Sequence, residues 1–252
     1  MTATLLLTVN VQGLGPEAAE AKGAPLFGRF AHGGYAAKVG MARLLDALRE
    51  AGLTATFFWP SSEALAMPAL LERCLREGHE VASHGRAFED HAALDPEQEA
   101  EVLEEAHDTL RRLCGTAPLG FRAPTGTLSA ATLPLLARLG YGYDSSFVDD
   151  DAPYPLAADG GGAMLELPWA EGLADATHFR RRLTQDRAEA MMTEELEALL
   201  PVAGYACLTL HPRADLGLAR TARLPILRRL LDRAAKLGAA PRPCRALLPA
   251  PA

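Results

Sequence analysis

The sequence predicts an α/β protein built as a (β/α) barrel of about seven parallel strands. Short apolar runs alternate with longer stretches of helical periodicity throughout the 252 residues. Polar residues capable of chemistry follow several of the apolar runs directly, as they do at the rim of a parallel barrel. No linker-like stretch interrupts the alternation, so residues 1–252 are expected to form a single domain. A loosely ordered Pro-rich tail is expected from about residue 240.

Each predicted strand is a short apolar run bounded by a turn or a helix signal. The first strand leads directly into the polar residues Asn10 and Gln12. The last leads into His211 and Pro212. The seven predicted strands cover residues 4–9, 53–59, 79–83, 119–121, 141–143, 163–169 and 205–210.

The segments between the strands carry apolar residues at helical spacing. The strongest start signal is Asp95-Pro96-Glu97-Gln98, in which Asp95 can cap the helix and Pro96 fits its first position. Ser62 and Ser129 are the expected caps of two other helices. The predicted helices cover residues 39–48, 63–76, 96–113, 129–139, 193–200 and about 220–237.

Composition limits the possible partners and the compartment. A net charge of −7 without basic-aromatic interleaving argues against nucleic acid and anionic membranes as partners. No apolar run is long enough for a membrane span. The chain begins without a signal-like segment, and its four cysteines lack C-x-x-C spacing. We therefore expect a cytoplasmic protein without a disulfide framework.

Five polar residues that are distant in the sequence should meet at the rim of the predicted barrel. Each directly follows a predicted strand. They are Asn10, His84, Arg122, Asp144 and His211. An imidazole at a barrel rim can transfer protons near neutral pH, although a packing or capping role for His211 is the alternative.

The other rim residues also have two interpretations each. Arg122 and Asp144 could form a charge pair that either holds two loops together or tunes His211. His84 is a candidate metal ligand, but a single histidine is a weak signal. Trp59 and Trp169 follow strands and could stack on a ligand, with core or interface packing as the alternative.

Five short motifs occur in the order found in the polysaccharide deacetylase (NodB-homology) superfamily, which the chain resembles. They are Thr56-Phe57-Phe58, Ser83-His84-Gly85, Arg122-Ala123-Pro124, Tyr143-Asp144-Ser145-Ser146 and Leu210-His211-Pro212. The fourth motif, with Asp149-Asp150 and Tyr154 after it, looks most like the peptidoglycan deacetylase and allantoinase-type branch. The resemblance implies a distorted (β/α) barrel that hydrolyses non-peptide C–N bonds, with a divalent metal such as zinc activating water.

The chain departs from this family pattern at three positions. Asn10 and Gln12 stand where the family has two aspartates, one a catalytic base and the other a metal ligand. Phe88 stands where the family has its second metal-binding histidine, and His91 is a possible but unexpected substitute. An amide cannot act as a carboxylate base, and a zinc site needs about three protein ligands. We therefore predict no metal site.

The resemblance assigns roles to the residues that remain. It makes His211 the general acid, Arg122 the residue that orients the base, and Asp144 part of the fourth motif. These three are the predicted catalytic residues. The predicted substrate-binding residues are Asn10, Gln12, His84 and Trp169.

Three functions are compatible with these residues. The first is metal-independent hydrolysis of an amide or cyclic amide of a sugar or small metabolite, without any cofactor. The second is non-catalytic binding of such a ligand. The third is a structural role beside an active homologue, and the resemblance also makes a homo-oligomer plausible.

Overall fold

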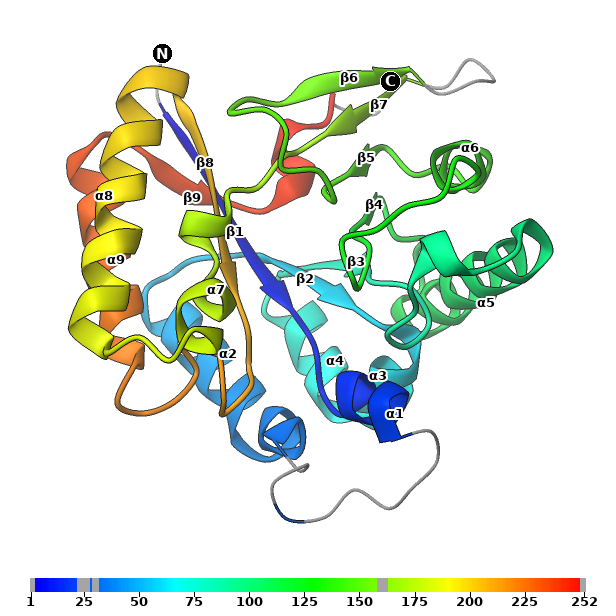
Figure 1. Ribbon diagram of the computed structural model, residues 1–252, viewed down its shortest axis with the longest axis horizontal. Helices are drawn as coiled ribbons and strands as arrows, with labels where there is room; N and C mark the ends of the chain where they lie inside the picture. Colours follow the sequence, from blue (N-terminus) through cyan, green and yellow to red (C-terminus); the bar gives the residue numbers. More distant parts are fainter. Residues whose placement is uncertain (1–2, 22–27, 29–31, 158–162, 250–252) are drawn as a thin grey trace.

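The computed structural model describes residues 3–21, 28, 32–157 and 163–249 (Figure 1). Within these residues nine strands form one sheet in the order β6-β7-β5-β4-β3-β2-β1-β8, and β9 pairs with β1 beside that path. Only the β6–β7 pair is antiparallel among the described strands. The strands are β1 (Thr4–Asn10), β2 (Thr56–Trp59), β3 (Glu80–Ser83), β4 (Gly120–Phe121), β5 (Tyr143–Asp144), β6 (Tyr154–Ala157), β7 (Ala163–Glu166), β8 (Tyr205–Leu210) and β9 (Ala240–Arg242).

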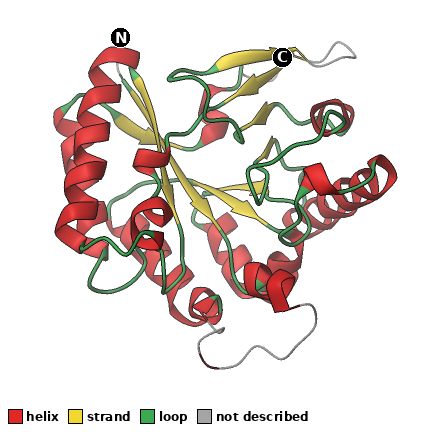
Figure 2. Cartoon of the chain, viewed as in Figure 1, coloured by secondary structure: helices red, strands yellow, loops and turns green. Residues whose placement is uncertain are grey.

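Helices surround the strands, with α8 and α9 at one side of the view and α5 and α6 at the other (Figures 1 and 2). The α-helices are α1 (Gly15–Ala21), α2 (Met41–Glu50), α3 (Ser61–Ala66), α4 (Pro68–Arg76), α5 (Pro96–Cys114), α6 (Thr132–Arg138), α7 (Asp175–Arg180), α8 (Gln185–Ala203) and α9 (Leu224–Lys236). A π-helical turn (Ala36–Gly40) and three 3₁₀ turns (His91–Ala93, Glu171–Leu173, Cys244–Leu247) complete the helical elements of the described residues. None of these helices combines the length and the apolar character needed to cross a membrane.

The predicted (β/α) barrel is confirmed as a mostly parallel sheet that curls into a half-barrel. The seven predicted strands correspond to β1–β5, β7 and β8, and the prediction missed β6 and β9. Strand pairing does not close the barrel within the described residues. Instead, the segment after β7 runs beside β8, where Ala174 bridges Thr209 and the Tyr205 hydroxyl donates to the Pro168 carbonyl over 2.7 Å.

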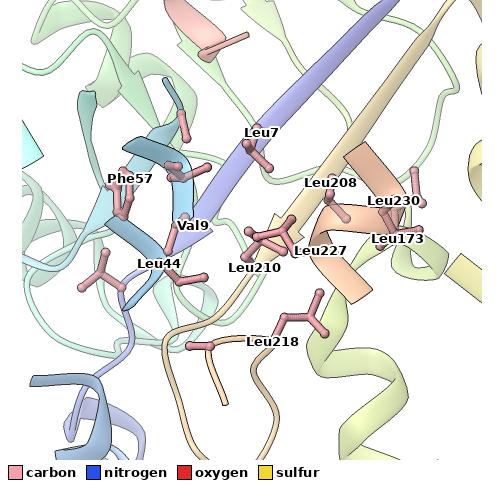
Figure 3. Packing of buried hydrophobic residues seen from close by; sticks show 14 of the residues in the cluster. Leu7, Val9, Leu44, Phe57, Leu173, Leu208, Leu210, Leu218, Leu227 and Leu230 are labelled. Atoms are coloured by element: carbon pink, nitrogen blue, oxygen red, sulfur yellow. The ribbon is translucent and has the colours of Figure 1, made fainter. Parts of the chain in front are cut away.

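Alternation along β1 and β8 separates an outward apolar face from an inward face that becomes polar toward the carboxyl ends, at Thr8 and Thr209. The outward residues Leu7, Val9, Leu208 and Leu210 are buried in one cluster with residues of the helices (Figure 3). In Figure 3 this cluster includes Leu44 of α2 with Leu227 and Leu230 of α9. Each such side chain contributes about 1.5–3 kcal/mol when buried, so the cluster fixes the helices against the sheet.

The predicted helix over residues 63–76 is instead two helices, α3 and α4. Pro68 begins α4, and the backbone of Met67 before it is not helical, with φ −128° and ψ 52°. A proline disfavours helical backbone at the preceding residue and cannot donate its own hydrogen bond, so the helix breaks there. Ser62 is not the cap, because α3 begins one residue earlier and the Ser62 N–H donates to the Arg86 carbonyl.

Other helix boundaries vary in accuracy. Asp95 caps α5 as predicted, accepting from the N–H groups of Glu97 and Gln98 over 3.1 and 2.8 Å. Ser129 accepts from the Ala131 N–H over 2.9 Å, but α6 itself begins at Thr132. Helix α8 is longer than predicted, and α1 and α7 were not predicted.

The expected loose tail is wrong for residues 240–249. Pro241 lies in the short strand β9, which pairs with Leu5 of β1. Cys244 is fully buried, and its N–H donates to Thr56 Oγ1 over 2.7 Å. Proline is tolerated in such an edge strand, which is why composition alone misled the prediction. Residues 250–252 lie outside the described part of the chain.

Candidate functional site

A cavity of about 660 Å³ opens at the carboxyl ends of the strands. It brings together five of the seven predicted site residues, which are Asn10, Gln12, Arg122, Trp169 and His211. The other two, His84 and Asp144, are fully buried and do not line this cavity. Helix α7 adds Thr177, Arg180 and the following Arg181 to its wall, and Phe88 lies at its edge.

The strand register places Asn10 beside His211. Thr8 of β1 pairs with Thr209 of β8, so the next inward residues are Asn10 and His211. The Asn10 Nδ2 lies 3.4 Å from the His211 Nε2. These two residues are 201 positions apart in the chain. They meet because each is the next inward-facing residue of two adjacent, paired strands.

Arg122 spans the floor of the site and is only 2% exposed. Its guanidinium donates to Asn10 Oδ1 over 3.1 Å and to the Ser145 hydroxyl over 2.7 Å. Further acceptors are the Ser145 carbonyl, Thr8 Oγ1 and Thr209 Oγ1. The guanidinium carbon also lies 4.3 Å from the centre of the Phe58 ring. All of these partners are neutral.

The predicted charge pair between Arg122 and Asp144 is wrong. The Asp144 carboxylate instead accepts from the N–H and the hydroxyl of Ser146, each over 2.9 Å. Side chains alternate along β5, so Tyr143 and Ser145 face the inside, where Ser145 meets Arg122. Asp144 therefore points to the other face, opposite Glu166 of β7.

His211 is held by Asp175, which the sequence interpretation missed. Asp175 is fully buried, and its carboxylate accepts from the His211 Nδ1 over 2.6 Å and from the His211 N–H over 2.9 Å. It also accepts from the Leu218 N–H over 2.8 Å. Asp175 is the first residue of α7, and an acidic residue is typical of a helix start. That signal was present in the sequence, but the helix itself was not predicted.

The hydrogen-bond chain determines which nitrogen of His211 faces the cavity. Arg122 can only donate, so it orients the Asn10 oxygen toward itself and the Asn10 NH₂ group toward His211. The His211 Nε2 must then accept, and the Nδ1–H donates to Asp175. The lone pair of an oriented imidazole therefore meets the Asn10 amide at the cavity wall, and a water that replaces this amide would find a general base.

His84 is buried behind Gln12 in a neutral state. Its Nδ1 donates to the Arg122 carbonyl over 2.7 Å, and its Nε2 lies 3.5 Å from the Gln12 Nε2. Burial lowers the pKa of His84 to about 3. The imidazole is therefore uncharged at neutral pH, with its Nε2 lone pair directed at an amide.

The donor set around His84 does not fit a zinc ion. The neighbour of its Nε2 is the Gln12 amide, and the Asn10 oxygen at the same cavity already accepts from Arg122. Zinc sites are built from imidazole, thiolate and carboxylate ligands. The described residues hold no group of three or more such side chains placed for a metal ion. His91, the possible substitute, lies 3.4 Å from Glu99 and packs edge-on against Phe121.

The two tryptophans lie in different environments. Trp59 is fully buried in the outward core cluster, as its packing alternative predicted. Trp169 lines the cavity, and its ring centre lies 5.9 Å from the Arg122 guanidinium carbon. Only Trp169 is therefore placed to contact a ligand.

The chain is similar to proteins of one family in sequence and in structure. The family model for polysaccharide deacetylase matches residues 33–143. The peptidoglycan deacetylase of Helicobacter pylori is 34% identical over 121 residues, which are 48% of this chain and 41% of that protein. The chain thus matches about two fifths of the length of the curated relatives.

Solved structures cover almost the whole chain. A protein of Mycobacterium smegmatis assigned to the polysaccharide deacetylases is 30% identical with a TM-score of 0.82, covering 92% of this chain and 84% of that one. Puue allantoinase shares the fold, with a TM-score of 0.80 at 24% identity and coverage of 93% and 85%. With its five ordered motifs and its half-barrel, this chain therefore belongs to the polysaccharide deacetylase family.

Proposed function

We propose that this protein hydrolyses a non-peptide C–N bond without a metal ion, with His211 as its acid–base group. The observation that carries the proposal is the chain of oriented groups from Arg122 through Asn10 and His211 to Asp175. It sets one imidazole nitrogen toward a cavity that can hold a small molecule. Family membership supports the type of bond.

The proposed reaction uses His211 first as a base and then as an acid. A water first replaces the Asn10 amide at the His211 Nε2. The Nε2 then takes a proton from this water while the water oxygen forms a bond to the substrate carbonyl carbon. Asp175 stabilises the imidazolium that forms, and the positive charge of Arg122 favours the oxyanion. His211 then gives its proton to the leaving nitrogen as the C–N bond breaks. The products are a carboxylic acid and an amine.

The absence of metal from the proposed reaction is supported by the donor set. Asn10, Gln12 and Phe88 replace the residues that would supply a base and two ligands. The remaining imidazole, His84, is directed at Gln12. Water activation in this proposal therefore depends on His211 alone.

The proposed substrates are amides or cyclic amides of sugars or small metabolites. The relatives named peptidoglycan deacetylase and allantoinase support this range. We also propose a cytoplasmic location, which is supported by four free cysteines among the described residues.

A second candidate is a non-catalytic protein that binds the same class of ligand. The observation in its favour is Asn10, an amide that cannot act as a base at the position where the family has an aspartate. Hydrogen-bond donors and acceptors around the cavity would suffice for binding. Turnover distinguishes the two candidates.

The test combines turnover, metal content and two substitutions. The purified protein is incubated with N-acetylglucosamine oligomers, allantoin and hydantoin, and the products are followed by NMR. We expect hydrolysis of at least one compound, no stoichiometric zinc by elemental analysis, and no loss of rate with a chelator. His211→Asn and Asp175→Asn should each lower kcat by about 10²–10⁴-fold. The control His107→Gln, in α5 away from the cavity, should retain full activity.

Different outcomes overturn different parts of the proposal. One equivalent of zinc together with loss of activity in chelator would refute the metal-free reaction. Ligand binding without any product would favour the binding protein. Full activity in the His211→Asn variant would remove His211 from the reaction.

A further inference from the structure

The floor of the cavity holds a positive charge without a negative partner among the described residues. Arg122 is buried, and its acceptors are hydroxyls, a carbonyl, the Cys207 sulfur and the Asn10 amide. Its flat faces lie near the rings of Phe58 and Trp169. A buried cation that is compensated only by dipoles and rings raises the local positive potential.

The rim of the same cavity carries two more arginines. Arg180 ends α7, Arg181 follows it, and both are exposed. No ion pair involves either of them in the part of the chain that the structure describes. Glu171 is the single acidic residue among the described residues that line the cavity. The rim therefore has a surplus of one positive charge in a chain whose net charge is −7.

We propose that the cavity selects substrates that carry a carboxylate, with Arg180 and Arg181 binding that group at the rim. This inference rests on the proposed hydrolysis and names its substrate class, an N-acyl amino acid or a cyclic amide with an acid side arm. A planar guanidinium binds a carboxylate through two parallel hydrogen bonds. One carboxylate balances the surplus charge of the rim and leaves Arg122 to stabilise the oxyanion.

The two positive regions serve different parts of such a substrate. The carboxylate lies at the exposed rim, where the arginines can adapt to it. The scissile carbonyl lies at the floor, beside His211 and the Asn10 amide that Arg122 orients. The rings of Phe88 and Trp169 also line the cavity and suit an apolar side chain.

The test compares two probes that differ only in charge. N-acetylphenylalanine carries a carboxylate, and N-acetylphenylalaninamide carries a neutral amide in its place. Binding of each is measured by calorimetry at low ionic strength, which does not require turnover. We expect N-acetylphenylalanine to bind about tenfold more tightly, because it gains a charge-assisted bidentate contact.

Substitutions assign the effect to the two arginines. Arg180→Gln and Arg181→Gln should each weaken binding of N-acetylphenylalanine by about fivefold to tenfold and leave the neutral probe unchanged. The matched control is Arg182→Gln, which removes the same charge from the next residue. Arg182 lines the neighbouring cavity instead, so its loss should change binding less than about twofold.

The outcomes separate this inference from the proposed function. Equal affinity for the two probes, or an equal effect of Arg182→Gln, would overturn the carboxylate site even if neutral amides are hydrolysed. Tight charge-dependent binding without product would support the site and refute the hydrolase. Inorganic phosphate that displaces N-acetylphenylalanine at equal or lower concentration would overturn the assignment in favour of a phosphorylated ligand.

Discussion

At the scale of single residues, Asn10 determines the hydrogen-bond network and the net charge of the site. An aspartate there would neutralise Arg122. The neutral Asn10 amide instead accepts from Arg122 with its oxygen and directs its NH₂ group at His211. The guanidinium thus keeps its net positive charge, and the His211 Nε2 accepts from the Asn10 NH₂ group. One substitution relative to the family pattern therefore changes both the net charge of the site and the hydrogen bond that the His211 Nε2 accepts.

Asn10→Asp should stabilise the fold. The new carboxylate would lie about 3 Å from the buried Arg122 and replace a neutral acceptor by a charged one. We expect the free energy of unfolding to rise by about 1–3 kcal/mol, measured by urea denaturation at pH 7. The control Gln12→Glu introduces the same charge facing His84 and should destabilise the fold. A fall in stability for Asn10→Asp would show that Arg122 is already compensated.

At the scale of elements, strand alternation decides which acidic residues can reach the cavity. Asp144 of β5 and Glu166 of β7 are paired in register and face away from Arg122. Burial and the nearby Asp144 carboxylate raise the pKa of Glu166 to about 10. Glu166 is therefore protonated at neutral pH, and the two residues share a structural role behind the site.

Glu166→Gln should change how stability depends on pH. Between its usual value of 4.5 and about 10, Glu166 keeps its proton in the native state and loses it on unfolding, so stability falls as pH rises. A glutamine stays neutral in both states and removes this slope. The free energies of unfolding are measured by urea denaturation at pH 6 and pH 9. The difference between the variant and the wild type should shift in favour of the variant by about 1 kcal/mol per pH unit. An equal change in the free energy of unfolding between pH 6 and pH 9 for variant and wild type would contradict the raised pKa of Glu166. The control is Glu171→Gln, which removes an exposed carboxylate.

At the scale of the whole molecule, residues 240–249 close the half-barrel at the amino ends of its strands. The strand β9 lies beside β1, and Cys244 contributes to the inward cluster with Leu6 and Phe58. The Arg245 N–H donates to the buried Glu80 carboxylate over 2.9 Å. The site at the opposite end of the strands is therefore supported by residues that lie far from it in sequence.

Removal of residues 243–252 should destabilise the whole domain. The truncation opens the inward cluster and removes backbone donors from Thr56 and Glu80. We expect a loss of about 3–5 kcal/mol in a single cooperative transition, measured by thermal and urea unfolding. The control Arg245→Ala removes only an exposed contact to the Gly78 carbonyl and should cost less than about 0.5 kcal/mol. An unchanged unfolding midpoint for the truncated protein would show that residues 243–252 do not contribute to stability.

The sequence by itself determined the order of elements and the residues at the ends of the strands. Short apolar runs such as residues 4–9 specify strands, and polar residues such as Asn10 and His211 directly after them must lie at one rim. Local patterns also marked the α5 cap at Asp95 and the unusual amides Asn10 and Gln12 after the first strand. These features depend on neighbours in the chain, so a single sequence contains them.

Only the tertiary structure decided which rim residues act together. Asp175 rather than Asp144 meets His211, because the segment after β7 folds back beside β8 while Asp144 alternates outward. That Arg122 has only neutral hydrogen-bond acceptors likewise becomes visible only when the fold places Asn10, Ser145 and Thr209 around it. Pairings of this kind depend on strand register and on the face that each side chain takes. Those are properties of the packed sheet, and no local pattern in the sequence encodes them.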